Sequence, residues 1–149
     1  MKLLKSILVV ILMSPAILAF SQTYSDFIVI DRIADNYAQL KTEFSGQANV
    51  YWTNGNSPNA IEQIANTAST LQIENLHIYA PTKQGAIVFN SIAITTHTLD
   101  ELAEQLSVWN NLVTHQVVIH SEVVFTGDQG ILLKQRLEEI TGLVFTMQN

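Results

Sequence analysis

Short apolar runs of strand type alternate along the chain with segments whose apolar residues recur at helical spacing. The first run, Phe27–Ile30, is apolar throughout and is closed by Asp31. This pattern is typical of a strand buried on both faces. The five expected strands are Phe27–Ile30, Ala48–Trp52, Leu76–Ala80, Gln116–His120 and Leu143–Thr146.

Four amphipathic segments lie between or beside these strands, with apolar residues three or four positions apart, as on one face of a helix. The expected inward positions are Ile33, Tyr37, Leu40 and Phe44 in the first helix; Ile61, Ile64, Ala65, Ala68 and Leu71 in the second; Leu99, Leu102, Leu106, Trp109 and Val113 in the third; and Leu133, Leu137 and Ile140 in the fourth.

Helix boundaries are marked by residues that satisfy exposed backbone groups. Ser57 is predicted to cap the second helix, with Pro58 at its first position. Thr98 and Glu101 have the spacing of a capping box at the start of the third helix. Gly142 is expected to end the fourth helix, because glycine readily adopts the left-handed conformation found there.

The region after the third strand predicts a short β-hairpin. Ala86–Phe89 and Ile92–Ile94 are apolar and flank Asn90 and Ser91, which favour a turn. Strand–helix–strand alternation favours a parallel sheet covered on both sides. We therefore predict one α/β domain over residues 22–149, a three-layer sandwich with a mostly parallel sheet of about five strands plus a short β-hairpin.

The first 21 residues have the features of an export signal. Lys2 and Lys5 precede the apolar segment Ile7–Met13, and small residues occupy the region up to Ser21. Cleavage is expected after Ser21, with Ala19 as the alternative. The apolar segment is shorter than the ~20 residues of a membrane-spanning helix, so a retained anchor is the weaker interpretation and no stable membrane anchor is predicted. We expect a secreted or periplasmic protein.

Composition excludes some chemistry. The chain has no cysteine, so it has neither disulfides nor a thiolate nucleophile. Loss of Lys2 and Lys5 with the signal would leave five basic residues against thirteen acidic ones, a formal charge of −8. This negative balance argues against nucleic acid or an anionic membrane as partner.

Candidate binding residues are expected where strands end, because ligands of open parallel sheets collect beyond the carboxyl ends of the strands. This rim comprises Asp31, the turn 53–57, the segment 81–84 and the segment 121–128. The candidate rim residues are Asp31, Asn54, Lys83, His120, Ser121 and Asp128.

The histidines offer only a weak case for a metal. His77 lies inside a strand, where a buried histidine hydrogen-bonded to a backbone group is the favoured interpretation. His120 ends the next strand and could neighbour His77 or Tyr79 across the sheet. A two-histidine site there would lack a third ligand, so no metal or cofactor is predicted. His97 and His115 are expected at ordinary loop or helix-end positions.

Serine and carboxylate chemistry at the rim is also weakly supported. Ser121 follows an apolar strand but lacks the Gly-x-Ser-x-Gly setting of a nucleophile elbow and a histidine placed as its base. A pairing of Glu122 with Asp31 as acid and base depends only on both following strands, and solvated loop carboxylates are the favoured interpretation. The Gly127–Gly130 segment matches no phosphate-binding motif, and the start of a helix is the better interpretation.

Two blocks of sequence resemble a bacterial domain-of-unknown-function family, numbered 4347, found near the N-termini of large exported, adhesin-like proteins. In the first block, Leu76–Phe89, the family has an apolar strand, Ser-His-Gly, a turn glycine and a hairpin. The turn glycine is present as Gly85, whereas the histidine position falls on Pro81 and its glycine on Thr82.

The second block, Val118–Val124, is similar to the family's apolar residues followed by Tyr-Gly-Cys. The cysteine position falls on Glu122, or on Ser121 in a register shifted by one residue. Gly127 and Gly130 agree with the family's glycines, and Thr141 and Gly142 agree with the start of its Thr-Gly-x-x-Val ending. The resemblance covers nearly the whole chain beyond the signal.

The resemblance implies a caspase-like fold in which a histidine assists a cysteine thiolate at the two strand ends. Proline and glutamate cannot do this chemistry. The leading hypothesis is therefore an exported, non-catalytic module that binds a protein or a small ligand. One alternative is a hydrolase that uses Ser121, Glu122, His120 or Asp31. The other is a structural assembly subunit with an apolar patch, for which the possible contributors are Tyr51, Trp52 and Trp109.

Overall fold

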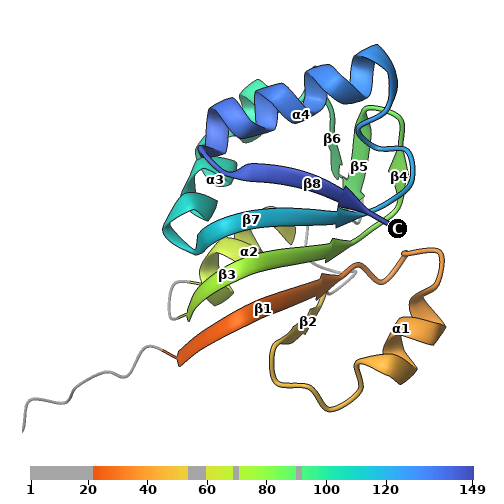
Figure 1. Cartoon of the computed structure of the whole chain (residues 1–149), viewed down its shortest axis with the longest axis vertical. Helices are drawn as coiled ribbons and strands as arrows, with labels where there is room; N and C mark the ends of the chain where they lie inside the picture. The colour runs from red at the N-terminus through yellow and green to blue at the C-terminus, as the bar shows by residue number, and fades with distance from the viewer. Residues whose placement is uncertain (1–21, 54–59, 69–70, 90–91) are drawn as a thin grey trace, which may run out of the picture.

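The computed structural model describes residues 22–53, 60–68, 71–89 and 92–149 (Figure 1). The strands are β1 (Gln22–Ile30), β2 (Val50–Trp52), β3 (Leu71–Tyr79), β4 (Thr82–Lys83), β5 (Ala86–Phe89), β6 (Ile92–Ile94), β7 (Val113–His120) and β8 (Val144–Gln148). The helices are α1 (Tyr37–Glu43), α2 (Ala60–Ala68), α3 (Leu99–Ser107), the 3₁₀ helix η1 (Val108–Asn111) and α4 (Gly127–Thr141).

Five strands form one parallel sheet in the order β2-β1-β3-β7-β8. The pairing register places Ile30 beside Tyr79, and His120 beside Gln148. The predicted parallel sheet of about five strands is therefore confirmed. A separate antiparallel sheet, β4-β5-β6, contains the predicted hairpin and adds a third strand at Thr82–Lys83. The predicted hairpin turn at Asn90 and Ser91 lies outside the described residues.

The direction of each connection determines which face its helix covers. From β1 the chain moves outward to β2, then reverses to β3 and continues through β7 to β8. Right-handed crossovers therefore place α1 on one face and the later helices on the other. Side chains of α2, α3 and α4 pack together against the second face, which gives the three-layer arrangement (Figure 1).

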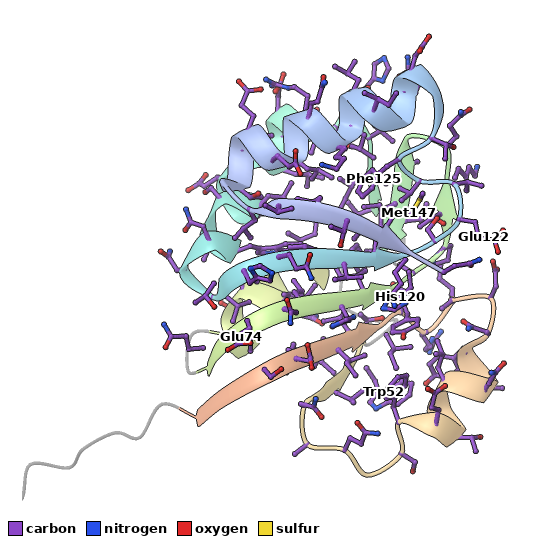
Figure 2. All side chains as sticks on the ribbon, viewed as in Figure 1. Trp52, Glu74, His120, Glu122, Phe125 and Met147 are labelled. Carbon is purple, nitrogen blue, oxygen red and sulfur yellow. The ribbon has the colours of Figure 1, made fainter. Side chains whose placement is uncertain are left out.

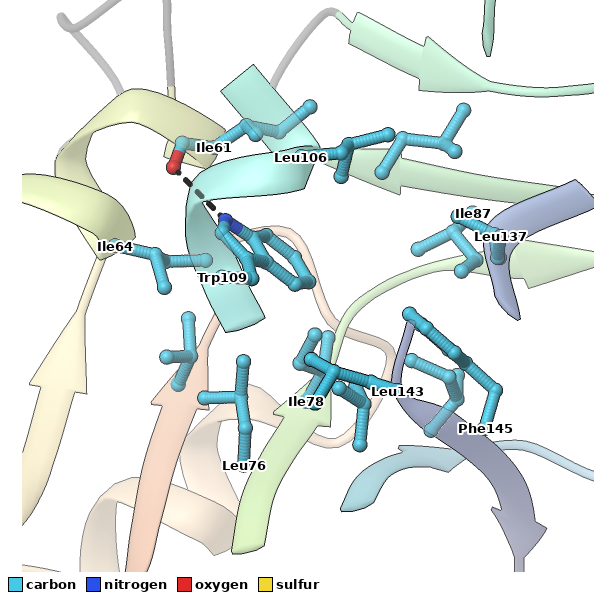
Figure 3. Packing of buried hydrophobic residues seen from close by; sticks show 14 of the residues in the cluster. Ile61, Ile64, Leu76, Ile78, Ile87, Leu106, Trp109, Leu137, Leu143 and Phe145 are labelled. Atoms are coloured by element: carbon cyan, nitrogen blue, oxygen red, sulfur yellow. Dashed lines mark hydrogen bonds between the residues drawn. The ribbon is translucent and has the colours of Figure 1, made fainter. Parts of the chain in front are cut away.

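Alternating side chains of the strands divide between these faces. In β1, Phe27 and Val29 enter the large core beneath α2, α3 and α4, whereas Ile28 and Ile30 pack under α1. Trp109 from η1 lies within the large core, and its Nε1 donates a hydrogen bond to the carbonyl oxygen of Ile61 (3.4 Å) (Figure 3). Its burial removes Trp109 from the candidate apolar patch.

One half of the α1-side face carries polar residues and, within the described chain, no helix covers it. The pairing register places Asn75 beside Gln116, and His77 beside Val118, on strands β3 and β7. Thr146 of β8 continues this face beside Val118. Helix α1 covers only the half formed by β2 and by Ile28 and Ile30 at the end of β1, so Asp26 at the start of β1 stays uncovered. The sheet therefore presents side chains with hydrogen-bonding groups where a doubly wound sheet ordinarily carries aliphatic residues.

Several predicted boundaries were wrong. Leu71 and Val113, assigned to the ends of helices, instead begin β3 and β7. The predicted capping box is absent, because the Thr98 hydroxyl donates to the carbonyl oxygen of Ala93 (2.6 Å). Gly142 does end α4, with a φ of 69°. The predicted capping by Ser57 and Pro58 lies outside the described residues.

The export-signal prediction, residues 1–21, also falls outside the described residues. Within the part of the chain that the structure describes, no helix is both long and apolar enough to cross a membrane.

Candidate functional site

A cavity of about 490 Å³ lies at the carboxyl ends of β3, β7 and β8, beside the loop that leads into α1. We call it the rim cavity. Its lining residues are Ala34, Asp35, Asn36, Tyr79, Ala80, Thr82, His120, Ser121, Glu122, Val123, Gln148 and Asn149. Strand order reverses between β1 and β3, so the cavity adjoins the position where open α/β sheets bind ligands. The sequence predicted a site at this edge, and four of its lining residues come from the predicted segments at the ends of β3 and β7.

Asp31 is buried next to the cavity and is not one of its lining residues. The side chain is fully buried, and its Oδ1 accepts the backbone N–H of Ile33 (2.9 Å). Its backbone N–H donates to the carbonyl oxygen of Tyr79 (2.7 Å), which joins the ends of β1 and β3. Asp31 does not line the cavity, whereas Glu122 is exposed there. The cavity gives no support to an acid–base pair of Asp31 and Glu122, because only Glu122 is among its lining residues.

Ser121 organises the loop after β7. Its Oγ accepts the backbone N–H groups of Val123 and Val124, both at 3.1 Å, and hydrogen-bonds the Thr82 hydroxyl at 2.7 Å. Both lone pairs of this oxygen accept hydrogen bonds from these N–H groups, so neither is free to attack a substrate. The contacts give Ser121 a structural role and tie β4 to the loop that carries Glu122.

Three glycines allow the β4–β5 turn, the loop after β7 and the start of α4 to pack closely. A Cβ on Gly130 would lie 2.6 Å from the carbonyl oxygen of Val124, and a Cβ on Gly85 would lie 2.8 Å from Cβ of Gln129. Gly85 also donates its N–H to the Val124 carbonyl oxygen (2.9 Å). Gly127 has a φ of 62°. These are the glycines of the sequence resemblance, and together they fix the outer side of the cavity.

The two positions that the resemblance assigns to histidine and cysteine follow the neighbouring strands β3 and β7. Glu122 lines the cavity directly, and Figure 2 labels it at the right-hand edge of the molecule. Pro81 lies between two lining residues, Ala80 and Thr82, and its carbonyl oxygen accepts the N–H of Val88 (2.9 Å). At the two positions the side chains are a pyrrolidine ring and a carboxylate.

A chain of hydrogen bonds leads from the uncovered half of the sheet face to the cavity. Asp26 Oδ1 lies 3.3 Å from Nε2 of His77, and Nδ1 of His77 lies 3.0 Å from Nε2 of His120. The His120 ring stacks on Tyr79 with centroids 3.8 Å apart. We call Asp26, His77 and His120 the relay. His77 is thus satisfied by side chains, not by a backbone group as predicted, and its side chain is 22% exposed.

Burial and hydrogen bonding set the charges along the relay. Burial, with a smaller contribution from nearby His77, lowers the pKa of His120 from 6.5 to about 4. The hydrogen bond from Asn75 lowers the pKa of Asp26; burial opposes this, and hydrogen bonds from Ser25 and His77 add to it. At neutral pH the relay therefore has an ionised carboxylate at its outer end and an uncharged imidazole at the cavity.

The expected contact of His120 with His77 or Tyr79 is confirmed for both residues. The facing nitrogens of the two histidines bind one another, so they are not both directed at a metal ion. Among the described residues, no group of three or more His, Asp or Glu side chains is arranged to hold one.

The other predicted residues lie elsewhere. Lys83 in β4 and Asp128 in the first turn of α4 are exposed and do not line the cavity. His97 is exposed in the turn before α3, as predicted, whereas His115 is exposed but lies within β7 rather than in a loop or at a helix end. Asn54 lies outside the described residues.

Sequence reasoning missed the residues that complete the site. Asp26 and Asn75 belong to mixed polar segments at the starts of β1 and β3, which the prediction left out of the strands. Asp35 of the loop before α1 and Gln148 at the end of β8 also line the cavity. Alternation of side chains would have placed Asp26 on the same face as Ile28, but only the register of β1 against β3 brings it to His77.

Comparison with known proteins places the chain in a family without a described activity. No curated protein and no solved structure matches it. A family model described as "Domain of unknown function (DUF4347)" matches residues 27–148, which run from within β1 to the end of β8. The chain therefore belongs to the DUF4347 family, as its sequence resemblance suggested.

Proposed function

We propose that this chain is an exported, non-catalytic binding module whose ligand occupies the rim cavity. The observation that carries the proposal is the cavity itself. It is large enough for a small molecule or a peptide side chain, and it lies at the strand ends where α/β sheets bind ligands. Its rim residues at the two positions implied to be catalytic are Pro81 and Glu122, which cannot form a thioester.

Contacts around the cavity support binding without catalysis. The Ser121 hydroxyl is held by Thr82 and two backbone N–H groups, so it is a poor nucleophile. Glu122 is exposed, and hydrogen bonds and close-packed glycines hold its loop in place. A fixed, solvent-accessible concavity is the form in which proteins present binding sites. Export is supported by the N-terminal residues alone, with their basic, apolar and small-residue regions.

One variant tests the binding site directly. Val123 lines the cavity and is 43% exposed, so Val123→Trp should fill the cavity with little cost to folding. Ile131 on α4 is 51% exposed and lies outside the cavity, which makes Ile131→Trp the matched control. The tagged full-length chain is cross-linked in its host, and exported fractions are compared by quantitative mass spectrometry.

We expect a stoichiometric partner or bound molecule with the unsubstituted chain and with Ile131→Trp, and its loss with Val123→Trp. Equal recovery with both tryptophan variants would place the binding surface elsewhere. Cellular fractionation of the same cells tests export, and recovery of the chain only from the cytosol would refute it.

A hydrolase remains the second candidate because of one observation. His120 lies in the cavity with His77 and Asp26 behind it, an arrangement that orients imidazole bases in enzymes. Incubation of the purified chain with peptide and ester libraries separates the two functions. The binding proposal predicts no turnover above that of the Glu122→Ala and His120→Gln variants. Turnover that either substitution abolishes would establish the enzyme.

A further inference from the structure

With both histidine rings neutral, the relay has only one arrangement of protons that fits an ionised Asp26. Its carboxylate accepts the amide N–H of Asn75 at 2.9 Å, so the nearby Nε2 of His77 must be the donor in the second contact. In a neutral His77 ring, Nδ1 is then the acceptor. His120 must therefore donate its Nε2–H across the 3.0 Å contact.

This arrangement leaves Nδ1 of a neutral His120 without a proton. Among the described residues, Nδ1 has no hydrogen-bond partner, and it is not among the buried polar atoms that lack one. It is therefore open to solvent on a residue that lines the cavity. The ring cannot present Nε2 instead, because that atom is bound to His77 and one ring face is stacked on Tyr79.

The remaining charges of the cavity have one sign. Asp35 and Glu122 are exposed and line it, and no lysine or arginine is among its described lining residues. Tyr79, the other titratable lining residue, has its pKa raised by burial and by Glu43, so it stays neutral. A ligand in this cavity would meet a hydrogen-bond acceptor at His120 and carboxylates around it. A ligand anion would be repelled by these carboxylates.

We propose that the relay fixes His120 as a neutral hydrogen-bond acceptor, and that the rim cavity therefore takes a cationic donor group, an ammonium or a guanidinium. The proposal rests on the proposed binding function and names its ligand class. A guanidinium suits this site best, because its several N–H groups can contact His120 Nδ1 and a carboxylate at once.

The proton arrangement is tested without any ligand. Two-dimensional NMR of the chain labelled with ¹⁵N in its histidines distinguishes the two neutral forms of each ring. We expect His77 and His120 both to carry the proton on Nε2. Asp26→Asn should lose this preference at His77, because an amide can donate as well as accept, whereas Asp128→Asn should not. A proton on Nδ1 of His120 in the unsubstituted chain would overturn the proposal.

The ligand class is tested with matched probes. N-acetyl-arginine amide carries a guanidinium, N-acetyl-citrulline amide replaces it with an uncharged group of the same shape, and N-acetyl-glutamate amide carries an anion. We expect the arginine probe to shift the His120 resonances and to bind about tenfold more tightly than the citrulline probe. Glu122→Gln should weaken arginine binding, and Asp128→Asn should leave it unchanged.

Two outcomes would overturn the ligand class and still leave the proposed function testable. Equal binding of the arginine and citrulline probes would show that the cavity does not select for positive charge. No response to the arginine probe would show that the ligand is not a guanidinium, even if Val123→Trp abolished recovery of a cellular partner. Failure of the binding function is a different result, in which Val123→Trp changes neither partner recovery nor any probe response.

Discussion

Replacing His120 should alter how the stability of the protein depends on pH. In the folded chain the pKa of His120 is lowered to about 4 by burial and by His77, whereas an unfolded chain has the ordinary value of 6.5. Between pH 6.5 and about pH 4, His120 is therefore mostly protonated in the unfolded state and mostly unprotonated in the folded state. The contribution of His120 to stability is present above pH 6.5 and is lost as the pH falls toward 4.

The size of the effect follows from these two values. Between pH 8 and pH 5, a shift from 6.5 to about 4 corresponds to a loss of about 2 kcal/mol in the free energy of unfolding. His120 is partly accessible to solvent, which screens the effect and reduces the expected loss to about 1 kcal/mol. The lowered pKa values of Asp26 and Glu138 matter only at lower pH, since carboxylates are protonated there.

Urea unfolding at pH 8 and pH 5 measures the effect for three proteins. The unsubstituted chain should lose about 1 kcal/mol more than His120→Gln between the two pH values. Glutamine can still donate to His77, so the variant should fold. His115→Gln, an exposed position on the same strand, should behave like the unsubstituted chain. Equal losses in the unsubstituted chain and His120→Gln would refute the assigned burial and charge state of His120.

Three further substitutions test the packing around the site by urea unfolding at pH 7. Gly130→Ala should destabilise by about 1–3 kcal/mol, because its Cβ would lie 2.6 Å from the Val124 carbonyl oxygen; unchanged stability would show that the loop adjusts freely. Glu138→Ala should be about 1–2 kcal/mol less stable than Glu138→Gln, which keeps an acceptor for the Phe145 N–H, and equal values would contradict that contact. Trp109→Phe should cost about 2 kcal/mol through lost volume and the lost indole N–H bond; a neutral result would place Trp109 outside the core.

The central strands were predictable because both of their faces are buried, which makes their sequences unbroken runs of apolar residues. Phe27–Ile30 packs against α1 on one side and the large core on the other, so an unbroken apolar run identified it. The start of β3 was hidden because Gln72 and Glu74 are exposed, which breaks the run. Leu71 then fell three residues after Ala68 and fitted the spacing of the preceding helix.

The candidate site could be predicted in its position but not in its contacts. Ser121, Glu122 and His120 were expected at the rim because strand ends meet at one edge of a parallel sheet. The relay depends on Asp26 facing His77, residues 51 positions apart whose contact is set by the pairing of β1 with β3. A single sequence carries no record of that register, and the role of the Ser121 hydroxyl depends on loop geometry in the same way.

The polar, helix-free half of the sheet face gives the relay a second opening to water. The Asp26 side chain is 46% exposed and that of His77 is 22% exposed, whereas His120 lies at the cavity. A ligand that closed the cavity would leave this outer end in contact with solvent. Protonation of Asp26 from this side would remove the acceptor that holds the His77 proton on Nε2, while the ligand stayed in place. The arrangement of protons behind a bound ligand would thus respond to acid outside the protein without a dissociation step.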